Sequence, residues 1–244
     1  MPYFKINKID ATDSTNSLLR ERYLEKKCSD GDVLWSNIQN RGRGQRNTVW
    51  QSESGKNLTF SVYVSLESLT LQNPFLLSCL VSLAIQETLK FYKLPKLKVK
   101  WPNDIMSGNK KVCGLLIENM FKGTKIQGSI IGIGLNVNQL EFKNLPSAVS
   151  MAQISGIQYE LDEVLNTCLE FLKQKLEVLK QQESYILKLY ETQLYRLGMT
   201  STFESNGSLF SGIIRGVSLK GLLKVQIEND QIVSFDLKTI KLKN

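Results

Sequence analysis

Apolar and polar residues alternate along several short stretches of the chain, and this period-2 pattern predicts β-strands. The clearest stretch runs from Asn57 to Val64, and the apolar residues on its one face are Leu58, Phe60, Val62 and Val64. Lys96 to Trp101 alternates apolar residues with lysines, as expected for a half-buried strand. Gly128 to Val137 is almost wholly apolar, which is typical of a strand buried on both faces.

Other stretches have the three-to-four-residue apolar spacing of helices. Pro74 to Tyr92 has this spacing without an internal breaker, and it predicts a core helix. Leu161 to Leu197 predicts one or two long amphipathic helices. Near the N-terminus, the segment Asp13 to Asn16 offers good N-cap residues for a helix from Ser17 to Leu24.

Shorter segments complete the prediction. Phe4 to Ile9 and Val33 to Trp35 are strand candidates, and the strand that ends at Trp101 pairs with Lys111 to Glu118 as a hairpin turning at residues 107–109. From Gly198 onward, short apolar segments between polar turns predict a small antiparallel β module of the barrel type. The expected division is a domain over residues 1–197 and a second over residues 198–244.

Charge and composition narrow the function. The chain has 244 residues, and its 31 lysines and arginines against 23 acidic residues give a net charge of +8. Such a balance attracts nucleic acid, phosphate ligands or an acidic protein. Because the chain has no histidine, a Ser-His-Asp triad, a Cys-His pair and an imidazole metal site are excluded.

Cysteine spacing and hydropathy set further bounds. Cys28, Cys79, Cys113 and Cys168 lie far apart without a CxxC spacing, so we interpret them as free buried thiols in a reducing cytoplasm. The first residues lack the apolar region of a signal peptide. No run of about 18 apolar residues occurs, so no membrane span is expected.

A loop from Gln39 to Arg46 is the first candidate for chemistry. Its glycines let the backbone approach a ligand, and its arginines offer planar donors for phosphate or carboxylate. It matches neither the P-loop nor the GxGxxG pattern. A solvated basic loop would have the same composition.

The segment from Lys100 to Asp104, with Lys111 soon after it, is the second candidate. Pro102 lacks an N–H and ends the strand, which brings a lysine, an asparagine and an aspartate together. Asp104 could hold Mg²⁺ against phosphate oxygens, and either lysine could neutralise developing negative charge. An ordinary charged surface turn is the alternative.

A third candidate is Gly132-Ile133-Gly134-Leu135-Asn136. Glycines inside a buried strand usually mark a bulge or a close approach of another group. Asn136, at the end of the strand, could bind a ligand. Tight packing of a helix across the sheet would also explain the glycines.

Taken in this order, the Ser14-Thr15-Asn16 cap, the Arg-Gly-Arg-Gly loop, Lys-Trp-Pro-Asn-Asp, Lys111 to Glu118 and Ile-Gly-Ile-Gly-Leu-Asn-Val resemble the biotin–protein ligases. The resemblance covers about Asp13 to Val137 and extends more faintly into the C-terminal β module. It implies an α+β fold, with a mixed sheet flanked by helices as in class II synthetases and a small C-terminal SH3-like barrel. It also implies that biotin reacts with MgATP to biotinyl-AMP, and that a lysine of a biotin carboxyl carrier protein then takes the biotin.

The resemblance also assigns roles to residues of this chain. The implied catalytic residues are Lys100, Lys111 and Arg43, and a magnesium ligand is Asp104. The implied biotin-binding residues are Ser14, Thr15, Asn16, Gln39, Arg43, Gly44, Gln45, Lys111 and Gly114. The implied ATP-binding residues are Arg46, Trp50, Asn103, Asp104, Gly134 and Asn136. Trp101 is interpreted as a core anchor rather than a base-stacking residue.

The chain departs from the family pattern in its loop. Gln45 stands where an arginine often helps to retain the adenylate, and Asn47 replaces a glycine. Because the matched region begins about ten residues from Met1, we expect a ligase without an operator-binding domain and without DNA as a partner. A cytoplasmic monomer or homodimer is expected.

Two rival hypotheses remain. A lipoate or octanoate ligase or transferase has a related fold, and its octanoyl-transfer type needs a nucleophilic cysteine, for which Cys113 is the candidate by position. Cys113 lies in an apolar strand, so we interpret it as a packing residue. A non-catalytic nucleic-acid-binding module would use the basic charge, but it would leave Asp104 without a role.

Overall fold

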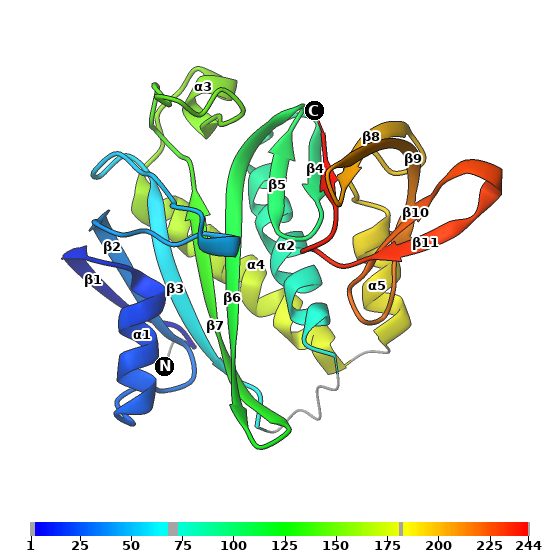
Figure 1. The fold of residues 1–244 in the computed structure, drawn as a ribbon. Helices are drawn as coiled ribbons and strands as arrows, with labels where there is room; N and C mark the ends of the chain where they lie inside the picture. The colour runs from blue at the N-terminus through cyan, green and yellow to red at the C-terminus, as the bar shows by residue number, and fades with distance from the viewer. Residues whose placement is uncertain (1–2, 68–72, 181–182, 244) are drawn as a thin grey trace.

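A seven-stranded mixed sheet forms the larger part of the structure (Figure 1). This computed structural model describes residues 3–67, 73–180 and 183–243. β1 and β2 are parallel, and every other neighbouring pair in the sheet is antiparallel. The strands, in spatial order, are β1 (Lys5–Thr12), β2 (Asp32–Gln39), β3 (Leu58–Ser65), β7 (Lys125–Leu135), β6 (Lys110–Lys122), β5 (Asp104–Ser107) and β4 (Leu97–Lys100).

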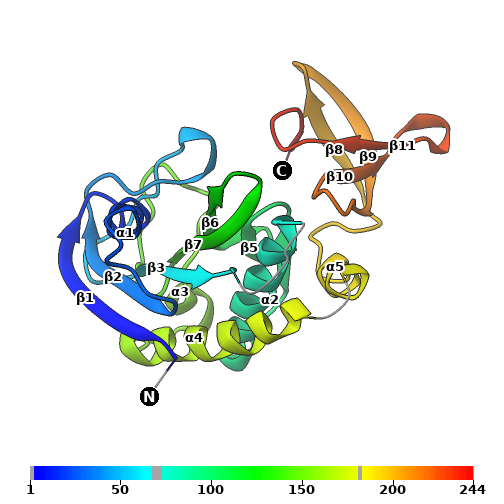
Figure 2. The ribbon, with the colours of Figure 1, turned by 90° about the horizontal axis from the view of Figure 1, so that it is seen from below.

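Helices cover both faces of this sheet (Figures 1 and 2). α2 (Phe75–Phe91) and α4 (Leu161–Glu177) pack on one face, where most residues of α2 are buried. α1 (Thr15–Leu24) lies on the opposite face, against β2, β3 and β7. The remaining helices are α3 (Met151–Ser155) and α5 (Glu183–Glu191), with 3-10 turns at Gln45–Asn47, Val178–Lys180 and Glu228–Asp230. The core helix predicted over residues 74–92 is confirmed.

β3 shows how this layering overrides a simple alternation. Its apolar residues form one face, as predicted, but Thr59, Ser61 and Tyr63 on the other face are also buried. α1 covers that second face. Small hydroxyl side chains are thus enclosed between a helix and the sheet, where each needs a hydrogen-bond partner.

The predicted hairpin after Trp101 is wrong in one respect. Residues 104–107 form a separate strand, β5, between β4 and β6. Asp104 therefore begins a strand instead of lying in a turn, and Lys100 is its partner in the register of β4 and β5. β5 lacks the alternation that reveals β4, because its two buried residues, Ile105 and Met106, follow one another.

The long helical stretch predicted over residues 161–197 divides into α4 and α5, and residues 181 and 182 lie outside the described parts. The helical conformation ends at Glu191, and Leu194 then bridges to Val99 of β4. Within the described residues, no helix is both long enough and apolar enough to cross a membrane.

A second sheet follows, as predicted from Gly198 onward. It is five-stranded and antiparallel, and the buried Phe203 stacks on Phe210, which in turn stacks on Phe235. The Trp101 indole N–H, from the larger sheet's β4–β5 turn, donates to the Gly221 carbonyl at 3.0 Å, which agrees with an anchoring role for Trp101. The strands, in spatial order, are β11 (Ile232–Phe235), β10 (Leu223–Gln226), β9 (Ser208–Val217), β8 (Thr200–Ser205) and β12 (Lys241–Leu242).

Candidate functional site

A cavity of about 270 Å³ opens between the start of α1, the loop of residues 40–50 and the face of β7 and β6. Segments far apart in sequence meet here, as the resemblance implies. Most of the predicted site residues line the cavity: Ser14, Thr15, Asn16, Gln39, Arg43, Gly44, Gln45, Trp50, Asn103, Asp104, Lys111, Gly114 and Gly134.

Three predicted residues lie outside the cavity lining. Arg46 is exposed on the loop, and Lys100 lies one strand away as the register partner of Asp104. Asn136 is buried, and its side-chain amide donates to the Val149 carbonyl at 3.2 Å. The roles that the resemblance implies for these three stay predictions.

Small residues in the centre of the sheet make room for the cavity. Gly114 of β6 pairs with Gly134 of β7, and Leu116 pairs with Gly132. A side chain at Gly134 would overlap the Trp50 ring, and one at Gly132 would overlap the Asn16 amide. The glycines therefore serve the close approach of these two side chains, which is what glycine inside a strand often indicates.

The start of α1 supplies uncharged polar groups to the floor of the cavity. Ser14 is the N-cap of the helix, and its side chain accepts from the Ser17 backbone N–H. The Thr15 backbone N–H and hydroxyl both donate to Gln39 Oε1, at 2.8 and 3.0 Å. These bonds fix the helix start against the end of β2.

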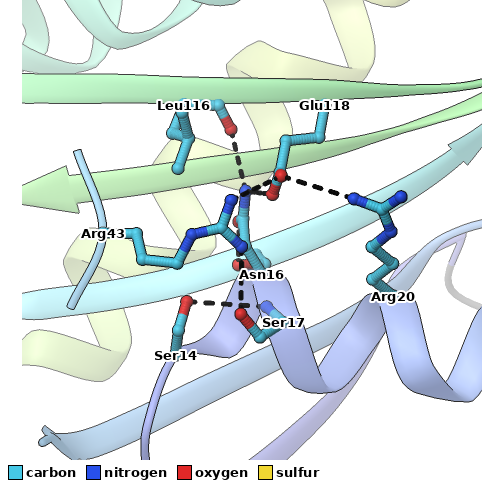
Figure 3. A network of polar contacts seen from close by, with 8 residues as sticks. Ser14, Asn16, Ser17, Arg20, Arg43, Leu116 and Glu118 are labelled. Atoms are coloured by element: carbon cyan, nitrogen blue, oxygen red, sulfur yellow. Dashed lines mark hydrogen bonds and ion pairs between the residues drawn. The ribbon is translucent and has the colours of Figure 1, made fainter. Parts of the chain in front are cut away.

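Asn16 is buried and is held from three sides (Figure 3). Its amide nitrogen donates to the Leu116 carbonyl at 3.1 Å and to Glu118 Oε2 at 2.8 Å. Ser61 Oγ lies 2.6 Å from Asn16 Oδ1 and 2.7 Å from Thr15 Oγ1. The floor is thus a hydrogen-bonded network in which the side chains of Thr15, Asn16 and Gln39 that line the cavity are uncharged, while the Glu118 carboxylate holds Asn16 from outside the lining.

The loop of residues 40–50 folds back on itself above this floor. Gly44 N–H donates to the Thr48 carbonyl, and Trp50 N–H donates to the Gly42 carbonyl, at 2.7 and 2.9 Å. Arg43 extends from the loop to the opposite wall, where it donates to Ser17 Oγ and to Glu118 Oε1 at 3.0 and 2.7 Å.

An ion pair stands at the other end of the cavity. Lys111 Nζ lies 2.6 Å from Asp104 Oδ1 and 5.5 Å from the centre of the Trp50 ring. The backbone of Lys111 is fixed on its far side by bonds to Ser147 and Val149.

A β-bulge aims Lys111 into the cavity. The register of β5 and β6 shifts so that Ile105 faces Cys113, but Met106 faces Lys111, with Val112 as the extra residue. In a regular strand Lys111 would share the core-facing side of Cys113. With the bulge it shares the face of Gly114, where a Cβ would lie 2.9 Å from Lys111 Nζ.

Lys100 has a perturbed environment beside this pair. Burial lowers its pKa from the ordinary value; Asp104 opposes that shift, and the nearby cations Lys111, Arg196 and Lys241 add to it. A cluster of lysines around one carboxylate is an environment in which an added anion is favoured.

The donor set is compatible with a nucleotide-bound Mg²⁺. Asp104 is the acidic residue in the cavity lining, and no group of three or more acidic or cysteine ligands occurs among the described residues. Mg²⁺ usually takes one or two carboxylates together with substrate phosphates and waters rather than an all-protein cage. Asp104 could therefore hold the ion only jointly with phosphate oxygens.

Sequence reasoning missed several residues of the site. Ser61 and Glu118 complete the network around Asn16. The sequence feature that could have indicated Ser61 is the row of hydroxyl side chains, Thr59, Ser61 and Tyr63, on the second face of β3, which is buried like the first. The lining also includes Thr48, Val49 and Phe60, together with Leu115, Leu116, Gly132 and Ile133, which lie in motifs that the sequence analysis had singled out without assigning them a role.

Known proteins match both sequence and fold. The family model described as biotin/lipoate A/B protein ligase family matches residues 9–136. The Bacillus spizizenii bifunctional ligase/repressor BirA is 26% identical over 238 residues, which are 94% of this chain and 72% of that protein. The Mycobacterium tuberculosis biotin–[acetyl-CoA-carboxylase] ligase is 23% identical, covering 94% of this chain and 86% of that protein.

A solved structure is similar over nearly its whole length. The biotin protein ligase from Aquifex aeolicus, in complex with biotin and ATP, superposes with a TM-score of 0.83 at 26% identity, covering 98% of each chain. The family match spans α1, the loop and β6 to β7, which are the elements that form the cavity. The chain therefore belongs to the biotin/lipoate A/B protein ligase family.

Proposed function

We propose that this protein is a biotin–protein ligase, which joins biotin to ATP as biotinyl-AMP and then transfers biotin to a lysine of a biotin carboxyl carrier protein. The cavity is the observation that supports this most: an uncharged polar floor at one end and the Lys111–Asp104 pair at the other. Biotin needs both features, since its fused-ring urea calls for uncharged hydrogen-bonding partners and its carboxylate tail calls for a cation. The relatives named as biotin ligases agree with this assignment.

In the first step two anions must meet, since the biotin carboxylate attacks the α-phosphate and pyrophosphate leaves. Lys111 would bind the carboxylate, and Lys100 would neutralise charge that develops on the phosphate. Fixed positive groups of this kind stabilise the transition state without reorganisation. The floor around Asn16 would hold the ring system, so that the reacting atoms stay in line.

Mg²⁺, when bound with ATP, would supply positive charge at the phosphates, with Asp104 as its protein ligand. Asp104 forms an ion pair with Lys111. The ligand carboxylate would take the place of Asp104 at Lys111, because the two anions would compete for one ammonium group. Asp104 would then face the nucleotide.

In the second step the acceptor lysine attacks the mixed anhydride and AMP leaves. The reactive adenylate needs shelter from water. The loop of residues 40–50, which Arg43 ties to the opposite wall, would provide it. We further propose a reducing, cytoplasmic location, which the four free cysteines favour.

Pyrophosphate exchange into ATP tests the function. Labelled pyrophosphate is incubated with the protein, MgATP and biotin, lipoate or neither. Exchange that depends on biotin is expected. Exchange with lipoate but not with biotin would assign the chain to the lipoate branch of the family.

Cys113 offers a direct test of the octanoyl-transfer alternative. Its side chain is fully buried, and burial raises the pKa of the Cys113 thiol well above its ordinary value. A thiol of this kind is not a ready nucleophile. We expect Cys113→Ala to keep biotin-dependent exchange within about threefold and to lose about 1 kcal/mol of stability, measured by exchange and urea unfolding. Abolished biotin-dependent exchange in a folded Cys113→Ala variant would contradict this.

We also propose that the C-terminal sheet is an SH3-like barrel and a separate domain, residues 198–244. Its five-stranded antiparallel order and its stacked phenylalanines support this.

A further inference from the structure

Glu118 on β6 has no role in the chemistry described above, yet it contacts both the floor of the cavity and the loop above it. Its Oε2 accepts from the Asn16 amide at 2.8 Å. Its Oε1 accepts from Arg43 of the loop at 2.7 Å, and Arg20 lies farther away at 3.9 Å. Figure 3 shows the three donors converging on this one carboxylate.

The ion pair between Glu118 and Arg43 is expected to be strong, because it is short and its carboxylate is largely shielded from water. The Glu118 side chain is 16% exposed, against 44% for Arg43 and 52% for Arg20. A charge-assisted bond at short distance to a shielded carboxylate is roughly twice as strong as a neutral one. An exposed pair near 4 Å, such as Arg20 with Glu118, contributes little.

Arg43 makes the charged contact of the loop with the opposite wall, while the Trp50 ring, at the end of the loop, packs close to Gly134 of β7. The other bonds of the loop are internal, as between Gly44 and Thr48, or lie at its base, where Asn40 and Arg41 donate to the carbonyls of Thr12 and Asp13. A loop fixed at its base and closed on itself can still swing as a unit. With Trp50 packed at one end, the position of the middle of the loop over the cavity depends on the far contact of Arg43.

We propose that Glu118 is a positioning residue that latches the loop of residues 40–50 over the cavity and so slows the release of the bound ligand. Asn16 orients the Glu118 side chain, because the hydrogen bond from its side-chain amide holds the other carboxylate oxygen toward Arg43. The identity of the ligand as biotin rests on the proposed function, but the latch itself does not.

Glu118→Gln tests the latch because the shape stays while the charge is removed. In the ligand-free protein, the rate of trypsin cleavage after the exposed Arg46 is expected to rise about tenfold, since a freer loop is cut more readily. The rate is measured by mass spectrometry under conditions where urea unfolding shows the fold intact. Arg20→Ala is the matched control, and its cleavage rate is expected to stay within about twofold.

With biotin, the dissociation rate and the KM of Glu118→Gln are each expected to rise about tenfold, while kcat at saturating biotin changes less than threefold. Arg43→Gln is expected to speed cleavage after Arg46 similarly, and the double variant no more than either single variant, because both changes break one contact. If the single effects multiply, or if Glu118→Gln is cleaved at the wild-type rate, the latch is refuted. If the wild type binds no biotin, the proposed function fails, and the cleavage assay still decides the latch.

Discussion

Replacing Lys111 with alanine is expected to slow biotin adenylation by about 10²- to 10³-fold, the usual effect of removing one preorganised group that stabilises a developing negative charge. Lys111 Nζ stands 2.6 Å from Asp104, at the cationic end of the cavity. Its loss would remove the ammonium group that pairs with Asp104 at the place where the biotin carboxylate must bind. Single-turnover formation of biotinyl-AMP measures the step directly.

Lys110→Ala is the matched control. Lys110 is the adjacent lysine on the same strand, but it is exposed and outside the cavity lining. Lys110→Ala is expected to form the adenylate at close to the wild-type rate, because Lys110 does not reach the cavity. The variant removes the same charge as Lys111→Ala, so it controls for the change in net charge. Adenylation by Lys111→Ala at near the wild-type rate would show that Lys111 is not the carboxylate contact.

The orientation of Lys111 also shows where prediction from sequence stops. A plain β6 alternation puts Lys111 on the face of Cys113, which is the core. The single extra residue Val112 reverses this and turns the lysine into the cavity. Bulges depend on how two strands pair, and a single strand's pattern does not report that pairing. The motif resemblance implied the role of Lys111, but only the structure gives its direction.

The helix α2 and the strand β7 were predictable because their sequence patterns depend on their own burial and not on how strands pair. α2 and β7 are enclosed by apolar neighbours, so the helical apolar spacing of α2 and the almost wholly apolar sequence of β7 both reflect their environment. β5 was missed because its buried residues, Ile105 and Met106, are consecutive and do not alternate. β8 was missed because one of its buried positions is the polar Ser201, and β12 because it has two residues.

The polar network of the floor was only half predictable. Asn16 was expected in the site, but its partners Ser61 and Glu118 lie far from it in sequence and meet it only when α1 packs over β3 and β6. A buried hydroxyl or carboxylate in a strand signals that a partner exists. It does not say which residue that partner is, and tertiary packing alone decides this.

Gly132→Ala is expected to damage this floor most directly. The new methyl group would overlap Asn16 Oδ1, in a side chain that its hydrogen bonds hold in place. Overpacking of this kind costs about 1–3 kcal/mol of stability. Because Asn16 must shift, biotin affinity is expected to fall, and the rate of adenylation is expected to fall about 10²-fold, the effect of misplacing the reacting group by about 1 Å. Urea unfolding, isothermal titration with biotin and single-turnover formation of biotinyl-AMP measure these effects.

Shortening Asn16 separates a clash with that side chain from any other effect of the methyl group. Asn16→Ala alone should lose both stability and biotin affinity, because Ser61 and Glu118 lose their shared partner. It also empties the space that the new methyl group needs. Adding Gly132→Ala to Asn16→Ala should then cost less than about 0.5 kcal/mol. An undiminished cost in that background would place the damage in the β-sheet backbone instead of the Asn16 contact, and the floor would have to be explained without the glycine.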